Sequence, residues 1–375
     1  MITISDQRTA YPAEPGPNHR ALAETAWTRH DITFPSSDAR CSAWLYLPDD
    51  AGTHAAVVMA HGLGAVRELR LDAYAERFAD AGYAVLVFDY RHLGASEGQP
   101  RQLIDIRRQL DDWHAALTYV RARPDIDTDR IAIWGSSLGG GHVLQISAED
   151  PHLRAVVSQC PFTDGPASTL ARTRTGTLSS AVLLTTAILD RLAALLGRRP
   201  ILVPMAGTKW MPAFLAAPDS LTGAIALAPP AAELSARTTR ALRFLPRLRR
   251  QILGHLTPAH SGRHAEDPVW GVLRSPTGQT LLINAVSARL ALQMPFYRPG
   301  RALARTTTPT LVCVCDHDTV APARTTTRRA RGLAHVTLNH YPYGHFDIYV
   351  GPEFERAVSD QLAFLAEHLN TGTTP

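Results

Sequence analysis

The residues most able to do chemistry lie at 135–139, where the chain reads Gly-Ser-Ser-Leu-Gly between a short apolar run and an amphipathic run. A serine at the centre of this G-x-S-x-G pattern occupies a turn so tight that its backbone is strained, and small flanking residues permit that turn. The turn lifts the hydroxyl clear of a sheet and points the N-terminus of the next helix at developing negative charge. We predict that Ser137 is a nucleophile that forms a covalent acyl-enzyme, with Ser136 as the weaker candidate.

The elements needed to position such a serine recur along the chain. Two β-rich runs at 27–34 and 40–47 predict an opening hairpin. Short apolar strands separated by amphipathic helices then predict a mostly parallel sheet that is covered on both faces. The expected strands are 55–59, 84–88, 131–134, 155–159, 309–314 and 335–341, and the expected helices are 71–81, 102–122, 138–148, 323–331 and 353–369.

This alternation stops near residue 161 and resumes at residue 309. A gap of roughly 140 residues is too long for a connecting loop, so it should carry structure of its own. We therefore expect an N-terminal extension at 1–26, an α/β core at 27–164 and 305–375, and a helical lid inserted at 165–304. The apolar helical stretches of the lid are 178–197, 241–255 and 279–293.

The core, about 27–164 and 305–369, resembles the α/β-hydrolase superfamily. Three runs carry a narrower resemblance to bacterial dienelactone-hydrolase and X-Pro-peptidase-like hydrolases: 61–68 (His-Gly-Leu-Gly-Ala-Val-Arg-Glu), 89–96 (Asp-Tyr-Arg-His-Leu-Gly-Ala-Ser) and 344–347 (Gly-His-Phe-Asp). They are also similar to the fungal polyketide transferases, which move an acyl chain from a carrier to an alcohol. The resemblance implies the α/β-hydrolase fold.

A serine nucleophile needs a base, and the base needs a carboxylate to orient it. In this superfamily they follow the serine in the order acid, then histidine, at the ends of successive strands. Asp318 is the preferred acid because it lies four residues before Pro322, a spacing that the resemblance associates with the acid turn. Asp316 is the alternative, expected otherwise to bond the local turn backbone. His345 follows the last strand and is the expected base.

An oxyanion hole needs two backbone donors aimed at one point. The N–H of Leu138, directly after the nucleophile, should be one of them. The second should come from the His-Gly-Leu-Gly loop at 61–64, where glycines allow a close approach to substrate, and we assign it to the N–H of Leu63. The loop pattern alone is equally typical of an ordinary strand-to-helix turn.

Apolar side chains of the lid suit a medium-length acyl or polyketide-like substrate, although each of them singly is more typical of lid packing. The candidates for substrate binding are Trp210, Met211, Phe214, Phe296 and Tyr297, with Trp270 and Met294 as further members of the set.

Composition bounds the remaining possibilities. The net charge is +4, but the basic residues are spread along the chain, and the densest patch at 237–250 is typical of a solvated helix face, so we expect no nucleic-acid partner. The apolar stretch at 181–206 is interrupted by charges and predicts no membrane span. The N-terminus lacks a signal-peptide pattern, and four cysteines without a metal-ligand spacing suggest reduced thiols. We expect a cytoplasmic protein without a metal site.

The leading interpretation is hydrolysis of a small-molecule carboxylic ester through an acyl-serine intermediate. Acyl transfer to an alcohol, or lactonisation by a thioesterase-like enzyme, would use the same three residues. The alternative outside catalysis is a binding protein on this fold, which usually lacks a member of the triad. None of these readings requires a cofactor. The stretch at 178–197 would serve a homodimer contact as readily as a lid.

Overall fold

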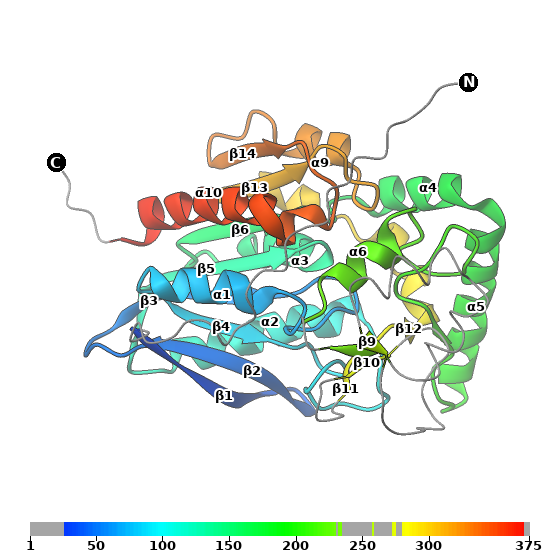
Figure 1. Cartoon of the computed structure of the whole chain (residues 1–375), viewed down its shortest axis with the longest axis horizontal. Helices are drawn as coiled ribbons and strands as arrows, with labels where there is room; N and C mark the ends of the chain where they lie inside the picture. Colours follow the sequence, from blue (N-terminus) through cyan, green and yellow to red (C-terminus); the bar gives the residue numbers. More distant parts are fainter. Residues whose placement is uncertain (1–25, 230–231, 235–256, 259–271, 275–279, 371–375) are drawn as a thin grey trace.

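The computed structural model describes residues 26–229, 232–234, 257–258, 272–274 and 280–370. Its centre is an eight-stranded sheet in the order β1-β2-β4-β3-β5-β6-β13-β14, with helices packed on both faces (Figure 1). The strands are β1 (Trp27–Ser36), β2 (Ala39–Pro48), β3 (His54–Ala60), β4 (Ala84–Phe88), β5 (Ile126–Ser136), β6 (Ala155–Gln159), β13 (Thr310–Cys315) and β14 (Val336–Tyr341). The helices that accompany them are α1 (Leu71–Asp80), α2 (Ile106–Arg121), α3 (Leu138–Ser147), α9 (Ala323–Ala330) and α10 (Gly351–Leu369).

The direction of each strand follows from its connection. β1 and β2 form the expected antiparallel hairpin, and β2 also pairs antiparallel with β4. Within this eight-stranded sheet, every pairing from β4 across to β14 is parallel, because helices return the chain to the same end of the sheet between strands. Every residue of β3, β4, β6 and β13 is buried, as expected for strands covered on both faces.

Two elements of the core differ from the sequence expectation by four or more residues at one end. The helix expected at 102–122 begins only at Ile106, because the Asp105 side chain accepts a hydrogen bond from the N–H of Arg108 and caps the first turn. The strand expected at 131–134 extends over the whole of β5. The α/β-hydrolase fold itself is as predicted.

The segment between β6 and β13 carries helices and short strands. Its described helices are α4 (Gly165–Thr175), α5 (Thr177–Leu195), α6 (Ser220–Ala226), and the 3-10 helices η2 (Ala288–Leu292), η3 (Met294–Phe296) and η4 (Pro299–Ala304). Its described strands are β7 (Leu202–Val203), β8 (Glu233–Leu234), β9 (Thr257–Pro258), β10 (Val272–Arg274), β11 (Thr280–Ile283) and β12 (Val286–Ser287). In Figure 1, α4 and α5 lie at the right-hand end of the molecule, and α6 is drawn nearer its centre.

Of the three helical stretches expected in this segment, α5 matches 178–197, whereas 241–255 lies outside the described residues. The helix expected at 279–293 is wrong, because this stretch forms β11, β12 and η2. Tertiary contacts explain the difference. Asn284 exchanges two side-chain hydrogen bonds of 2.9 Å with the backbone of Ala206, and Val286 pairs with Val203 of β7. These contacts hold the segment extended.

The four thiols are free and buried, in keeping with the sequence. Within the described residues, one helix, α5, is long and apolar enough to meet the length and composition of a membrane span, with a mean hydropathy of 1.5 over its best window. Its carboxylate Asp190 is fully buried against Arg289 inside the protein. The helix is therefore attached to the folded chain along one side.

Candidate active site

Ser137 lies between the last residue of β5 and the first residue of α3, with φ 56° and ψ −118°. Such a positive φ is strained for a residue with a side chain and persists only where the surroundings enforce it. The surroundings here are two close backbone approaches. A Cβ on Gly135 would lie 2.2 Å from the carbonyl oxygen of Gly139, and a Cβ on Gly139 would lie 2.5 Å from that of His61. Both glycines of the motif are therefore required by packing.

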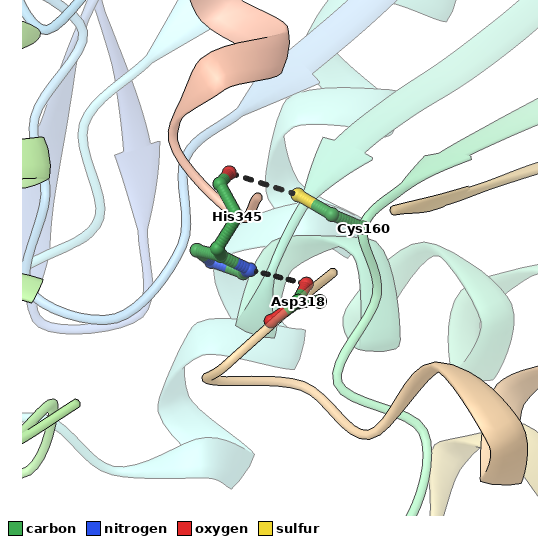
Figure 2. A group of neighbouring side chains, drawn as sticks. All are labelled: Cys160, Asp318 and His345. Atoms are coloured by element: carbon green, nitrogen blue, oxygen red, sulfur yellow. Dashed lines mark hydrogen bonds and ion pairs between the residues drawn. The ribbon is translucent and has the colours of Figure 1, made fainter. Parts of the chain in front are cut away.

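A chain of hydrogen bonds joins three side chains from different strand ends. The Oγ of Ser137 lies 3.1 Å from Nε2 of His345, and Nδ1 of that histidine lies 2.7 Å from Oδ2 of Asp318. The imidazole and the carboxylate are almost completely buried. Figure 2 shows the ring of His345 pointing at Asp318. This arrangement can move a proton from the hydroxyl to the imidazole while the carboxylate fixes the ring.

The two acid candidates have different surroundings. The second oxygen of Asp318, Oδ1, accepts hydrogen bonds of 2.7 and 2.6 Å from the N–H groups of Val320 and Ala321, which fix the carboxylate in place. Asp316 lies at the surface, 2.6 Å from Nδ1 of His340. The expectation that Asp316 bonds the turn backbone is wrong, because its carboxylate reaches across to β14, and Asp318 bonds that turn instead.

The electrostatics of His345 reflect this pairing. Burial alone would lower the pKa of the imidazole, but the Asp318 carboxylate and, after it, the Cys160 sulfur outweigh burial, and the pKa lies well above its ordinary value. The backbone of His345 has a partner as well. The Cys160 thiol donates a weak hydrogen bond, 3.9 Å long, to the carbonyl oxygen of His345 (Figure 2). Nothing in the sequence pattern indicated a role for Cys160.

The donor atoms of Cys160, Asp318 and His345 lie within 4.8 Å of one another, a spacing that could hold a metal ion. Both ring nitrogens of His345 are already engaged, one by Ser137 and the other by Asp318. A metal ion at this cluster would have to displace one of these hydrogen bonds. The geometry is therefore suited to proton transfer.

The loop after β3 passes directly beside the nucleophile. A Cβ on Gly62 would lie only 2.7 Å from the Cβ of Ser137, so glycine is required there. Leu63 and Leu138, the residues expected to supply oxyanion donors, both line the cavity that contains Ser137. The N–H of Leu138 belongs to the first turn of α3, where no helical carbonyl is available to it.

His61 organises this loop, a role that the sequence reading did not assign. Its Nδ1 accepts the N–H of Gly62 at 2.9 Å, and its Nε2 donates to the carbonyl of Leu69 at 2.9 Å. Burial lowers the pKa of His61 to about 4, so the ring is neutral and its tautomer is fixed by the two bonds. Its ring also stacks on Tyr349. The His-Gly-x-Gly run was the available signal.

A cavity of about 420 Å³ extends from Ser137 between the core and the inserted segment. Its size lies within the range of small-molecule sites. One wall carries hydroxyl groups of α4 and α5, and the rest is mainly apolar. The apolar lining includes Phe162, Leu183, Phe214, Ala217, Met294 and Val320.

The side chains expected to bind substrate are placed differently from one another. Phe214 lines the cavity, as does Met294. Trp210 and Phe296 project into solvent. Tyr297 is turned into the core, where its hydroxyl lies 2.8 Å from Nδ1 of His142 and its ring stacks on Phe162. Met211 packs near Gly207 outside the cavity lining. Trp270 and the arginine-rich run 237–250 lie outside the described residues.

Comparison with known proteins assigns the family. The family described as serine aminopeptidase, S33, matches residues 51–198. The quorum-quenching protein AidA of Acinetobacter baumannii (strain MDR-ZJ06) is 42% identical over 335 residues, which cover 89% of this chain and 93% of AidA. The chain belongs to the α/β-hydrolase superfamily. It is a hydrolase by this kinship, and its fold agrees.

Two other relatives show a narrower or more distant likeness. The polyketide transferase ATR5 of Stachybotrys chlorohalonatus (strain IBT 40285) is 33% identical over 181 residues, covering 48% of this chain and 58% of the transferase. The crystal structure of the α/β hydrolase GrgF from Penicillium sp. sh18 superposes with a TM-score of 0.63 at 23% identity, covering 91% of this chain and 99% of GrgF. The second likeness concerns the fold alone.

Proposed function

We propose that this hydrolase cleaves a carboxylic ester with an apolar acyl group through an acyl-enzyme on Ser137. The observation that carries the proposal is the continuous hydrogen-bonded chain from Ser137 through His345 to Asp318, which opens into a largely apolar cavity. The strained backbone of Ser137 supports it, since such strain is concentrated at functional sites.

The first half of the reaction forms the acyl-enzyme. Nε2 of His345 takes the hydroxyl proton while Oγ of Ser137 attacks the carbonyl carbon of the ester. The negative charge that develops on the carbonyl oxygen is stabilised by the N–H groups of Leu63 and Leu138 and by the N-terminus of α3. The C–O bond to the alcohol then breaks, and the imidazolium returns the proton to the leaving oxygen.

The second half repeats these steps with water. His345 accepts a proton from water, the hydroxide attacks the acyl carbon, and collapse of the intermediate releases the carboxylic acid and returns the proton to Ser137. Asp318 stays ionised throughout and stabilises the imidazolium. An alcohol in place of water would give acyl transfer, the reaction named in the polyketide transferase relatives, and no contact in the described residues favours that acceptor.

The direct test combines a fluorophosphonate probe with p-nitrophenyl esters of graded chain length. Wild type should be labelled and active, and Ser137→Ala should be neither. Ser136→Ala is the matched control, because this neighbouring hydroxyl is buried and bonded to Tyr349; it should still be labelled. Labelling that disappears in the Ser136 variant and persists in the Ser137 variant would reverse the assignment.

The cavity makes a separate prediction about chain length. Phe214→Ala removes a ring from the apolar wall and enlarges the cavity. The ratio of kcat/KM for long-chain to short-chain acyl esters should therefore rise, with little change for the acetate ester. Trp210→Ala is the control, since this side chain is 80% exposed and outside the cavity lining. Equal chain-length profiles for both variants and wild type would show that the acyl group binds elsewhere.

A further inference from the structure

The helix α5 exposes an apolar surface that the fold does not cover. Only 22% of the most apolar 18-residue stretch of this helix is buried. On a helix with 100° between successive residues, the exposed apolar side chains cover about 160° of the circumference, opposite to the side that packs on the protein. This surface, called here the α5 face, consists of Leu178, Val182, Leu184, Ile188, Leu189, Leu192, Leu195 and Leu196.

The opposite side of α5 holds the helix firmly on the protein. Asp190 is fully buried, and its two oxygens accept hydrogen bonds of 2.8 and 2.7 Å from the guanidinium of Arg289 and bonds of 2.8 Å from the N–H groups of Arg289 and Ile201. Leu183 and Ala187 pack beside it. Withdrawing the helix would leave a buried charge without a partner. The α5 face can therefore lie on an external surface, and the helix cannot leave the fold to cross a membrane.

The charges around the α5 face have one sign. From residue 165 to residue 217 the sequence contains a single acidic residue, the buried Asp190, against six basic ones. The exposed basic residues are Arg174, Arg191, Arg198, Arg199 and Lys209. Next to Lys209, whose Nζ lies 4.8 Å from the ring centroid, Trp210 is 80% exposed. Leucines flanked by cations and an exposed tryptophan are typical of helices that lie in a membrane interface.

We propose that the α5 face, with Trp210 beside its N-terminal end, docks on an anionic lipid surface. The charge pattern favours lipid over a second copy of this chain. In a symmetric pair the basic rim of one face would meet the basic rim of the other, whereas anionic headgroups neutralise it. The residue before Trp210 is tied to α5, because the carbonyl of Lys209 accepts a hydrogen bond of 2.9 Å from the Ser179 hydroxyl.

The proposed docking surface adjoins the cavity. Ala181 and Leu184 line the cavity and are also exposed on the side of α5 that would meet lipid. This juxtaposition deepens the proposed function and rests on it: the ester would be one that partitions into membranes and reaches Ser137 past α5. Docking itself does not require catalysis.

The test measures cosedimentation of the full chain, carrying Ser137→Ala so that hydrolysis plays no part, with vesicles of phosphatidylcholine with and without phosphatidylglycerol. Binding is expected only with phosphatidylglycerol and should weaken as salt rises. Leu189→Gln/Leu192→Gln should weaken it at least about tenfold, since two exposed leucines that lipid would cover are lost.

Two further variants test the contribution of the basic residues beside the α5 face. Arg198→Gln/Arg199→Gln should weaken binding and flatten its salt dependence. Arg324→Gln/Arg328→Gln, which removes two exposed arginines from α9, should leave binding unchanged. Light scattering of the same protein samples without vesicles measures whether the α5 face instead binds a second copy of the chain. Absence of vesicle binding, or a dimer that the leucine variant converts to a monomer, would overturn the proposal.

Discussion

Replacing Asp318 with asparagine keeps the shape of the side chain and exchanges one carboxylate oxygen for an NH2 group. The structure fixes which way the amide must face. The N–H groups of Val320 and Ala321 both point at Oδ1, so that position must remain an oxygen. The NH2 group is then placed 2.7 Å from Nδ1 of His345, where the carboxylate oxygen Oδ2 had been.

An NH2 group at that position donates to Nδ1, so the neutral imidazole must carry its proton on Nε2. The lone pair that should accept the proton of Ser137 is then absent. The corresponding change in a serine protease lowers kcat by about 10⁴-fold, which corresponds to about 5.5 kcal/mol at 1.36 kcal/mol per tenfold. With the same buried geometry here, we expect kcat of Asp318→Asn to fall by about 10³- to 10⁴-fold.

The assay is steady-state hydrolysis of a p-nitrophenyl ester, with circular dichroism melts to verify folding. Asp316→Asn is the matched control, because this residue is the other acid candidate and its side chain is 43% exposed beside His340; its kcat should stay within about twofold of wild type. The reasoning fails if Asp318→Asn retains more than about a tenth of wild-type kcat while folded, or if the Asp316 variant is the one that loses activity.

Three further predictions concern other parts of the site. The Asp318 carboxylate raises the pKa of His345 above its ordinary value, so kcat/KM should fall as the pH drops through a point above 6.5. In Asp318→Asn this loss of activity should occur at a lower pH. A loss that begins only below pH 6.5 in wild type would contradict the reasoning. Gly62→Ala places a Cβ 2.7 Å from that of Ser137, so the loop or the nucleophile must shift. In protein that circular dichroism shows to be folded, kcat should fall by about 10²-fold, and the melting temperature should fall as well. Normal turnover would mean that the position of this loop does not matter for the reaction. Asp190→Asn leaves Arg289 without its charge partner, and urea titration should show a loss of about 3 kcal/mol of unfolding free energy; an unchanged midpoint would mean that α5 is held by apolar packing alone.

Local chemistry made the core predictable. The sharp turn at Ser137 depends on glycines two residues before and after it, so five consecutive residues are enough to predict the turn. The alternation of fully apolar strands with amphipathic helices follows from burial on both faces, which the sequence records directly. These short-range requirements suffice for the succession of strands and helices along the chain and for the strand ends at which Ser137, Asp318 and His345 lie.

The inserted segment was less predictable because long-range contacts decide its structure. An apolar run at 279–293 fits a helix by periodicity, yet the bonds of Asn284 to Ala206 hold it extended. In the same way, Tyr297 resembles a substrate contact in sequence, and its hydroxyl is instead bonded to His142 inside the core.

The sequence by itself was enough to predict the superfamily, the sharp turn at Ser137 and the strand ends at which Asp318 and His345 lie, because each depends on residues close together along the chain. Only the tertiary structure shows that the Asp318 carboxylate contacts His345, whereas the Asp316 carboxylate contacts His340. These side chains lie two residues apart after the same strand, and the backbone amides and ring that meet each one come from the turn and from β14. It also decided which apolar residues of the inserted segment line the cavity and which, like those of α5, face outward.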